Sequence, residues 1–210
     1  MSYKTNPKVE EVLNTISHGI GVILSLLACW YLWKADSGKT IWSFYSVWIY
    51  GGSLVLLFSS STLYHAVLNP KWKRRFRILD HISIYFLIAG TYTPVALISL
   101  LEGNGILLFF TVWGMALFGT FFKLFHTGRF EFMSLLLYMI MGWLIVLDFD
   151  NLMAHTTQQG IDFLLLGGMF YTVGIFFYAW RRIPYNHFIW HLFVLGGAIS
   201  HFLFIYIDVV

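Results

Sequence analysis

The stretch HFIWHLFVLGGAISHFLFIYIDVV, residues 187–210, decides the fold of this chain. A helix needs about 20 consecutive apolar residues to cross the hydrocarbon core of a bilayer, and this run is long enough. The run is continuously apolar rather than alternating, which favours a helix over a strand of a membrane barrel. It therefore predicts a transmembrane helix.

Six further runs of the same kind precede it, at residues 16–33, 41–68, 79–101, 105–125, 130–149 and 161–180. The 210 residues are 59% hydrophobic and only 11% charged, which excludes a soluble domain because too little polar surface exists to cover a core. Cys29 is the only cysteine, which excludes an internal disulfide and a cysteine-rich metal site. The sequence thus predicts an all-α integral membrane protein in which residues 1–210 form a single domain of seven transmembrane helices.

The basic residues predict the orientation of these helices, because cytoplasmic loops carry an excess of Lys and Arg. With seven spans, the N-terminus and the connections after the second, fourth and sixth helices share one side. The other side carries only Lys34 and Lys39 of the 13 basic residues. We therefore expect a cytoplasmic N-terminus and an external C-terminus in a cell membrane, the bacterial inner membrane or a plasma membrane, and no nucleic-acid partner. The eleven residues on the first side are Lys4, Lys8, Lys71, Lys73, Arg74, Arg75, Arg77, Lys123, Arg129, Arg181 and Arg182.

Five polar residues are expected at one level of the membrane. His187 and His191 lie on one face of the last helix, about 6 Å apart along its axis. Ser61 and His65 have the same spacing at the end of the second predicted helix, and Asp80 stands at the start of the third. The second helix ends at the cytoplasmic face, and the third and seventh begin there.

Three neutral imidazoles with one open coordination position are typical of a catalytic zinc site. We therefore predict Zn²⁺ held by His65, His187 and His191. Asp80 would then take a proton from a zinc-bound water, and Ser61 would hydrogen-bond that water or the oxyanion.

Each of these residues also has an ordinary structural interpretation. The histidines at this spacing are also typical of membrane-interface residues that hydrogen-bond to neighbours. Asp80 can cap the third helix or pair with Arg77, and Ser61 can bond to a carbonyl of its own helix. The coincidence of all five at one depth is what favours a metal.

The remaining histidines fall outside the predicted ligand set. His18, in ISHGIGV, lies near the cytoplasmic level and is a candidate partner of the ligands. His81 points about 100° away from Asp80, so it is a partner or takes no part. His201 lies about 15 Å beyond His191 along the helix, too deep to share the ion. His126 and His155 are expected in solvated connections.

Three segments carry a resemblance to a known family: SSSTLYH (59–65), LDHISIYFLIAGTYTP (79–94) and HFIWHLFVLGGAISHF (187–202). They resemble the signature segments of the bacterial hemolysin III family, which is similar to the progestin and adiponectin receptors and the alkaline ceramidases. The resemblance runs from ISHGIGV to the end of the chain. It implies zinc held by three histidines, with an Asp and a Ser around a bound water. Those residues correspond to His65, His187, His191, Asp80 and Ser61, without a departure at any of the five.

Three functions follow as hypotheses. The first is a zinc-dependent intramembrane hydrolase of lipid amides or esters, serving membrane lipid homeostasis, because acyl carbonyls lie near the headgroup boundary where the site is expected. The second is a lipid-sensing or receptor-like regulator without turnover, with membrane lipids as ligands. The third is a pore-forming hemolysin acting by cytolysis; the uniformly apolar chain disfavours it, because soluble pore formers keep polar surfaces until they insert.

Overall fold

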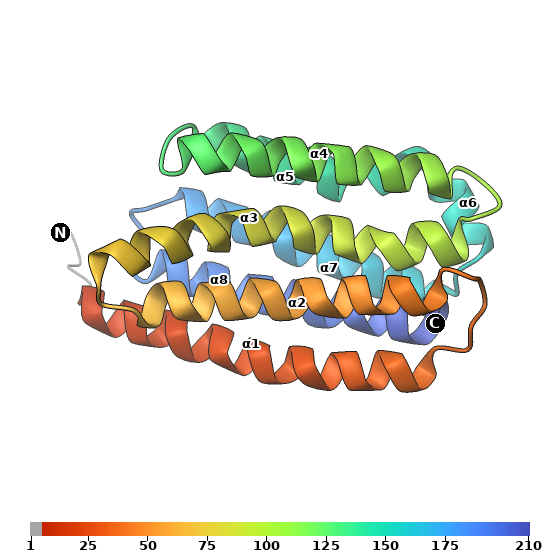
Figure 1. Ribbon diagram of the computed structural model, residues 1–210, viewed down its shortest axis with the longest axis horizontal. Helices are drawn as coiled ribbons and strands as arrows, with labels where there is room; N and C mark the ends of the chain where they lie inside the picture. The colour runs from red at the N-terminus through yellow and green to blue at the C-terminus, as the bar shows by residue number, and fades with distance from the viewer. Residues whose placement is uncertain (1–5) are drawn as a thin grey trace.

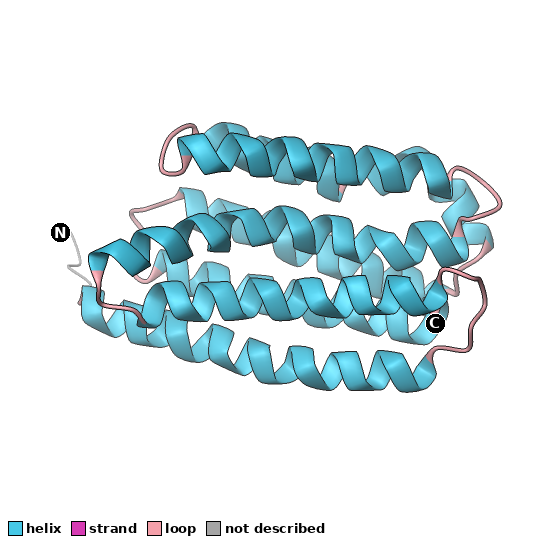
Figure 2. Cartoon of the chain, in the orientation of Figure 1, coloured by secondary structure: helices cyan, strands magenta, loops and turns pink. Residues whose placement is uncertain are grey.

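The computed structural model describes residues 6–210, and in that range every regular element is a helix (Figures 1 and 2). Seven helical segments are long and apolar enough to cross a membrane, which confirms the predicted all-α class and the count of seven. Three of these segments comprise more than one element: η1 continues α3, α5 continues through η2 into α6, and η3 continues α8. In chain order the elements are α1 (Pro7–Ala35), α2 (Ser43–Ala66), α3 (Pro70–Pro94), η1 (Val95–Ser99), α4 (Gly105–His126), α5 (Glu131–Gly142), η2 (Leu144–Asp148), α6 (Phe149–Ala154), α7 (Gln158–Ala179), α8 (Asn186–Phe204) and η3 (Ile205–Val209).

The long helices lie side by side along the longest axis of the molecule (Figure 1). α2 packs between α1 and α3, α7 packs on α8, and α1 closes the bundle against α8. The outer face of α4 shows what surrounds the bundle, because Leu117, Phe118, Phe121 and Phe125 are each more than half exposed. Contiguous large apolar side chains on a surface suit a hydrocarbon environment rather than water. The fold is that of a multi-pass membrane protein.

Two helices begin nine residues earlier than predicted. α1 starts at Pro7 rather than at residue 16, and α3 starts at Pro70 rather than at residue 79. In both cases an asparagine precedes the proline, and its side chain accepts a hydrogen bond from a backbone N–H of the first turn. An Asn cap followed by Pro at the first position is a strong helix start. The basic run 71–77 is therefore helical and not a loop.

This early start corrects the expected position of Asp80. Asn69 caps α3, and Asp80 lies about three turns further along the helix. A capping role for Asp80 is therefore excluded. The first part of α3 carries the basic side chains and precedes the apolar part of the helix. It lies at the end of the bundle where α1 begins (Figure 1). Lys4 lies outside the described residues.

The predicted fifth helix, 130–149, is wrong as a single continuous helix. α5 ends at Gly142, and a 3-10 segment leads into the short α6. The cause is a side chain from α3. The Tyr92 hydroxyl donates to the carbonyl of Gly142 at 3.0 Å and accepts from the backbone N–H of Ile145 at 2.9 Å. A side chain inserted into the backbone ladder in this way breaks a helix.

A buried ion pair joins α4 to α5. Lys123, one of the basic residues counted on the cytoplasmic side, is fully buried, and its Nζ donates to Glu131 Oε2 at 3.0 Å. Arg77 and His81 of α3 lie near the same carboxylate, at 3.8 and 3.9 Å. The pair therefore fixes the start of α5 against α3 and α4.

Removing the carboxylate is expected to destabilise the bundle. Glu131→Met leaves the Lys123 ammonium buried without its carboxylate, which costs about 3 to 5 kcal/mol of unfolding free energy. The double variant Lys123→Met/Glu131→Met should recover much of that loss, since an apolar pair replaces an ion pair at little cost. Thermal unfolding in detergent measures both, with the exposed Glu102→Met as the control. An equal loss of stability in the single and the double variant would contradict a stabilising ion pair between Lys123 and Glu131.

Candidate metal centre

Three histidines from two helices converge inside the bundle. His65 is the penultimate residue of α2, and His187 and His191 occupy the first two turns of α8. One nitrogen from each ring lies within 4.8 Å of the other two. His65 and His191 are buried, at 5% and 2% exposure, and His187 is half-buried. We call these three residues the histidine cluster.

α1 orients two of the three rings. The Nδ1–H of His65 donates to the Glu11 carboxylate at 2.9 Å, and the same carboxylate accepts from Lys73 Nζ at 3.0 Å. The Ser17 hydroxyl donates to the Asn14 carbonyl, so its oxygen is free to accept from His191 Nδ1 at 3.4 Å. These contacts fix the tautomer in which each Nε2 is unprotonated and can bind a metal. Partners of this kind hold metal-ligating histidines in place.

The donor atoms fit a metal ion. His65 Nε2 is buried and has no hydrogen-bond partner among residues 6–210. A buried ring nitrogen left unpaired is unfavourable, whereas an ion bound between the three rings would satisfy it. Three imidazoles without a fourth protein ligand correspond to a metal site that keeps an open position. The histidine cluster is thus able to hold a metal ion.

Asp80 and Ser61 lie beside the histidine cluster, from α3 and α2. Ser61 is 1% exposed, and its hydroxyl lies next to the Asp80 carboxyl without reaching hydrogen-bond geometry. The Asp80 carboxylate is 3.7 Å from His81 Nδ1. The Arg77 guanidinium, the alternative partner predicted for Asp80, lies 3.8 Å from Glu131.

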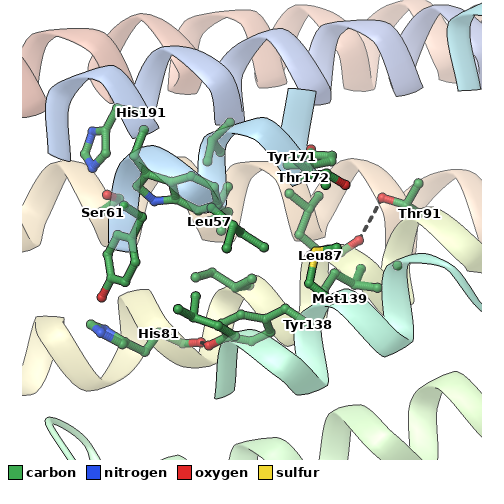
Figure 3. Close-up of a pocket in the computed structure, with 18 of the residues that line it drawn as sticks. Leu57, Ser61, His81, Leu87, Thr91, Tyr138, Met139, Tyr171, Thr172 and His191 are labelled. Atoms are coloured by element: carbon green, nitrogen blue, oxygen red, sulfur yellow. Dashed lines mark hydrogen bonds between the residues drawn. The ribbon is translucent and has the colours of Figure 1, made fainter. Parts of the chain in front are cut away.

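Both residues line a cavity of about 130 Å³ that also reaches His187 and His191. Figure 3 shows Ser61, His81 and His191 at one end of this cavity. Thr91 and Thr172 lie toward the other end, and the walls between are mainly apolar. The walls come from α1, α2, α3, α5, α7 and α8, and the cavity runs along the bundle from the histidine cluster into its interior.

Four of the other five histidines lie apart from the cluster. His201 donates to the Leu164 carbonyl at 3.2 Å, and His81 donates to the Arg77 carbonyl at 2.7 Å. His126 is the last residue of α4 rather than part of a connection, and it stacks on Phe122. His155 is exposed after α6. His18 does touch the cluster, because its ring stacks on His191 with centroids 3.6 Å apart.

Sequence reasoning missed the contribution of Glu11, Asn14 and Ser17. The predicted first helix begins at residue 16, so Glu11 and Asn14 have no predicted place in the membrane; Ser17 lies within that predicted helix, but its spacing does not indicate its contact with His191. The signal that would have found them is Asn6–Pro7, which starts α1 early enough to bring Glu11 to His65.

Glu11→Gln is expected to weaken metal binding about 10- to 100-fold, the usual effect of losing the carboxylate behind a ligating histidine. The amide still accepts from His65 Nδ1, so the ring keeps its place but loses the negative charge that raises its basicity. Competition with a chelator of known affinity measures the change. Glu102→Gln, an exposed position, is the matched control. Unchanged affinity in Glu11→Gln would show that the carboxylate serves only the ion pair with Lys73.

Seven apolar helices around a buried three-histidine cluster define a multi-pass membrane protein with a candidate metal centre. The profile of the family described as haemolysin-III related matches residues 7–202, and the chain belongs to that family. It is 45% identical to a hemolysin-3 homolog of Bacillus subtilis (strain 168) over 92% of this chain and 91% of the relative. It is 45% identical to hemolysin-3 of Bacillus cereus, over 92% and 89% of the two chains. It is 29% identical to the human monocyte to macrophage differentiation factor, over 92% and 82%.

Proposed function

We propose that this protein is a zinc-dependent membrane hydrolase that cleaves an amide or ester bond of a lipid. The observation that carries the proposal is the shared cavity: Asp80, Ser61 and two residues of the histidine cluster open onto one mainly apolar space. A carboxylate, a hydroxyl and a metal site at the mouth of such a space can act on a carbonyl whose acyl chain lies within it.

The residues divide into a metal-holding set and a reacting set. His65, His187 and His191 would hold the ion through ring nitrogens. Bound zinc would polarise the lipid carbonyl and lower the pKa of a water molecule to about 7. Asp80 would accept a proton from that water while the oxygen of the water attacks the carbonyl carbon of the lipid. The Ser61 hydroxyl donates to the carbonyl oxygen as negative charge develops there.

The proton that Asp80 takes from the water is needed again when the leaving group departs. The bond from the carbonyl carbon to nitrogen or oxygen breaks, and Asp80 returns the proton to the leaving amine or alcohol. The products are a fatty acid and the rest of the lipid, so one water is consumed and no other reactant is required.

The cavity supplies the length for an acyl chain. Thr91 lies about 16 Å along α3 from Asp80, and His201 lies about 21 Å along α8 from His187. All four residues line the cavity, so it extends through about half of a hydrocarbon core about 30 Å thick. A chain entering beside Asp80 would run toward Thr91 and Thr172.

We infer that the N-terminus is cytoplasmic and that the protein resides in the cell membrane. The described basic residues support this, because those of α3 and of the α7–α8 turn share the end of the bundle where α1 begins (Figure 1). A reporter fused after Val210 is expected outside, and one inserted between Ala66 and Pro70 inside. The measurement is the activity of a reporter that works on one side only. Two reporters on the same side would refute the orientation.

The function is tested on purified protein incubated with lipid extract. Released fatty acid should appear with metal-loaded protein and disappear when a chelator removes the ion. Re-addition of zinc should restore it. If the loaded protein releases no fatty acid from any lipid fraction, the hydrolase proposal fails.

A regulator without turnover is the second candidate. The name of the human relative, a differentiation factor, favours it. Such a protein would bind the lipid in the same cavity and change its conformation, so the lipid would be recovered intact. The names of the bacterial relatives point to hemolysis instead. The apolar exterior of the bundle fits a resident of the membrane better than a soluble pore former.

A further inference from the structure

His18 is a fourth histidine at the metal centre, and it differs from the other three. It lies on α1, is 3% exposed, and its ring stacks nearly parallel on His191, with an angle of 12° between the planes. The edge of Phe58 closes its other side at a centroid distance of 5.1 Å. The ring is therefore held in place by packing alone.

Both ring nitrogens of His18 are buried and have no hydrogen-bond partner in residues 6–210. Four other histidines near the cavity differ in this respect. His81 and His201 each bond to a backbone carbonyl, and His65 and His191 are bonded through Nδ1 to residues of α1. A buried donor and acceptor without partners calls for an explanation such as a bound ligand.

The partner of His18 has to come from the cavity. His18 lines the cavity together with Ser61 and Asp80. The Ser61 hydroxyl is likewise buried without a partner within the described range. Two unpaired polar side chains therefore open onto the mouth of an otherwise mainly apolar space. A lipid with its acyl chain in that space would bring its polar linkage to this end.

We propose that His18 is a lipid-binding residue, whose ring N–H donates a hydrogen bond to an oxygen of the polar linkage of the bound lipid. The proposal rests on the proposed function for the place of the lipid, but not for its cleavage. His18 is not a metal ligand in this arrangement, because the three nitrogens that converge belong to the histidine cluster. It anchors the lipid from α1, whereas the Asp80 carboxylate comes from α3.

A matched pair of variants tests the hydrogen bond. Leu and Asn have nearly the same shape, and only Asn can donate and accept hydrogen bonds. His18→Leu should weaken binding of the lipid about ten-fold, the worth of about one hydrogen bond, whereas His18→Asn should retain most of it. Where the protein hydrolyses the lipid, KM should rise in His18→Leu with little change in kcat, because the bond is present before and during reaction.

Binding is measured with two fluorescent probes that carry the same acyl chain, one as an amide and one as an ester of ethanolamine. Metal content and thermal unfolding are measured on the same preparations, with Ser25→Ala, a buried site elsewhere on α1, as the control. Weak binding by His18→Leu with retained binding by His18→Asn supports the inference, even if the wild type cleaves neither probe. Failure of the wild type to bind either probe overturns it.

Two other results also overturn it. Equal binding by the Leu variant, the Asn variant and the wild type would show that the ring nitrogens touch no lipid. Loss of the metal or of binding in both variants alike would show that His18 acts by packing against His191. Failure of cleavage in the wild type with normal probe binding concerns the proposed hydrolase alone.

Discussion

Alanine in place of His65, His187 or His191 is expected to reduce bound zinc from about one ion per chain to nearly none. Each substitution leaves two imidazoles, too few for a site that begins with three. The measurement is elemental analysis of purified protein after dialysis against a weak chelator. This loss is the largest effect that we expect from any single change in the chain.

The controls are His126→Ala and His155→Ala, which remove histidines outside the cluster. Each bonds only to a backbone carbonyl of its own helix or the helix before it, so both variants should keep the zinc of the wild type. Undiminished zinc in all three cluster variants would refute the metal centre. Equal loss in all five would indicate adventitious binding to surface histidines.

Asp80→Asn is expected to lower lipid hydrolysis by about 10² to 10⁴ while the zinc stays bound. The amide keeps the shape of the carboxylate and cannot take a proton from water. Because Asn69 caps α3, the change leaves the helix start intact, and thermal stability should be close to that of the wild type. Metal content, thermal unfolding and fatty-acid release are measured on one preparation.

Ser61→Ala should cost less activity than Asp80→Asn, since the metal and Asp80 would still activate the water. Zinc lost together with activity in Asp80→Asn would mean that Asp80 is a direct ligand, and the division of roles would be wrong. Full activity in Asp80→Asn would remove Asp80 from the reaction altogether.

The helices and the histidine cluster could be predicted from the sequence alone, and the reason is physical. A membrane imposes one length and one composition on every span, so each crossing can be recognised without its neighbours. Pairs such as His187 and His191 share a helix face by spacing alone, and the alternation of direction brings His65 to the same level. These features depend only on local periodicity and on the count of spans.

What the sequence did not reveal depends on contacts between helices or on helix starts outside the apolar runs. The Tyr92 hydroxyl of α3 causes the break after α5, and no pattern within residues 130–149 predicts it. The contact of Glu11 with His65 depends on a turn of α1 that precedes its apolar run. Lys123 was counted on the cytoplasmic side, but its burial depends on its contact with Glu131 of the next helix, which the count of spans does not indicate. The unpaired nitrogens of His18 follow from packing, which spacing does not disclose.

The contact between α1 and α8 links the metal centre to the biosynthesis of the chain. Ribosomes deliver the N-terminal helices first, so α1 and α2 enter the membrane with Glu11, Ser17 and His65 already present. Two of the three ligands are on the last helix to be made. A translation product that stops short of His187 therefore carries only His65 of the histidine cluster, and a fragment that ends before residue 65 carries none of the three. Binding of a metal by all three histidines therefore requires that α8 has been synthesised.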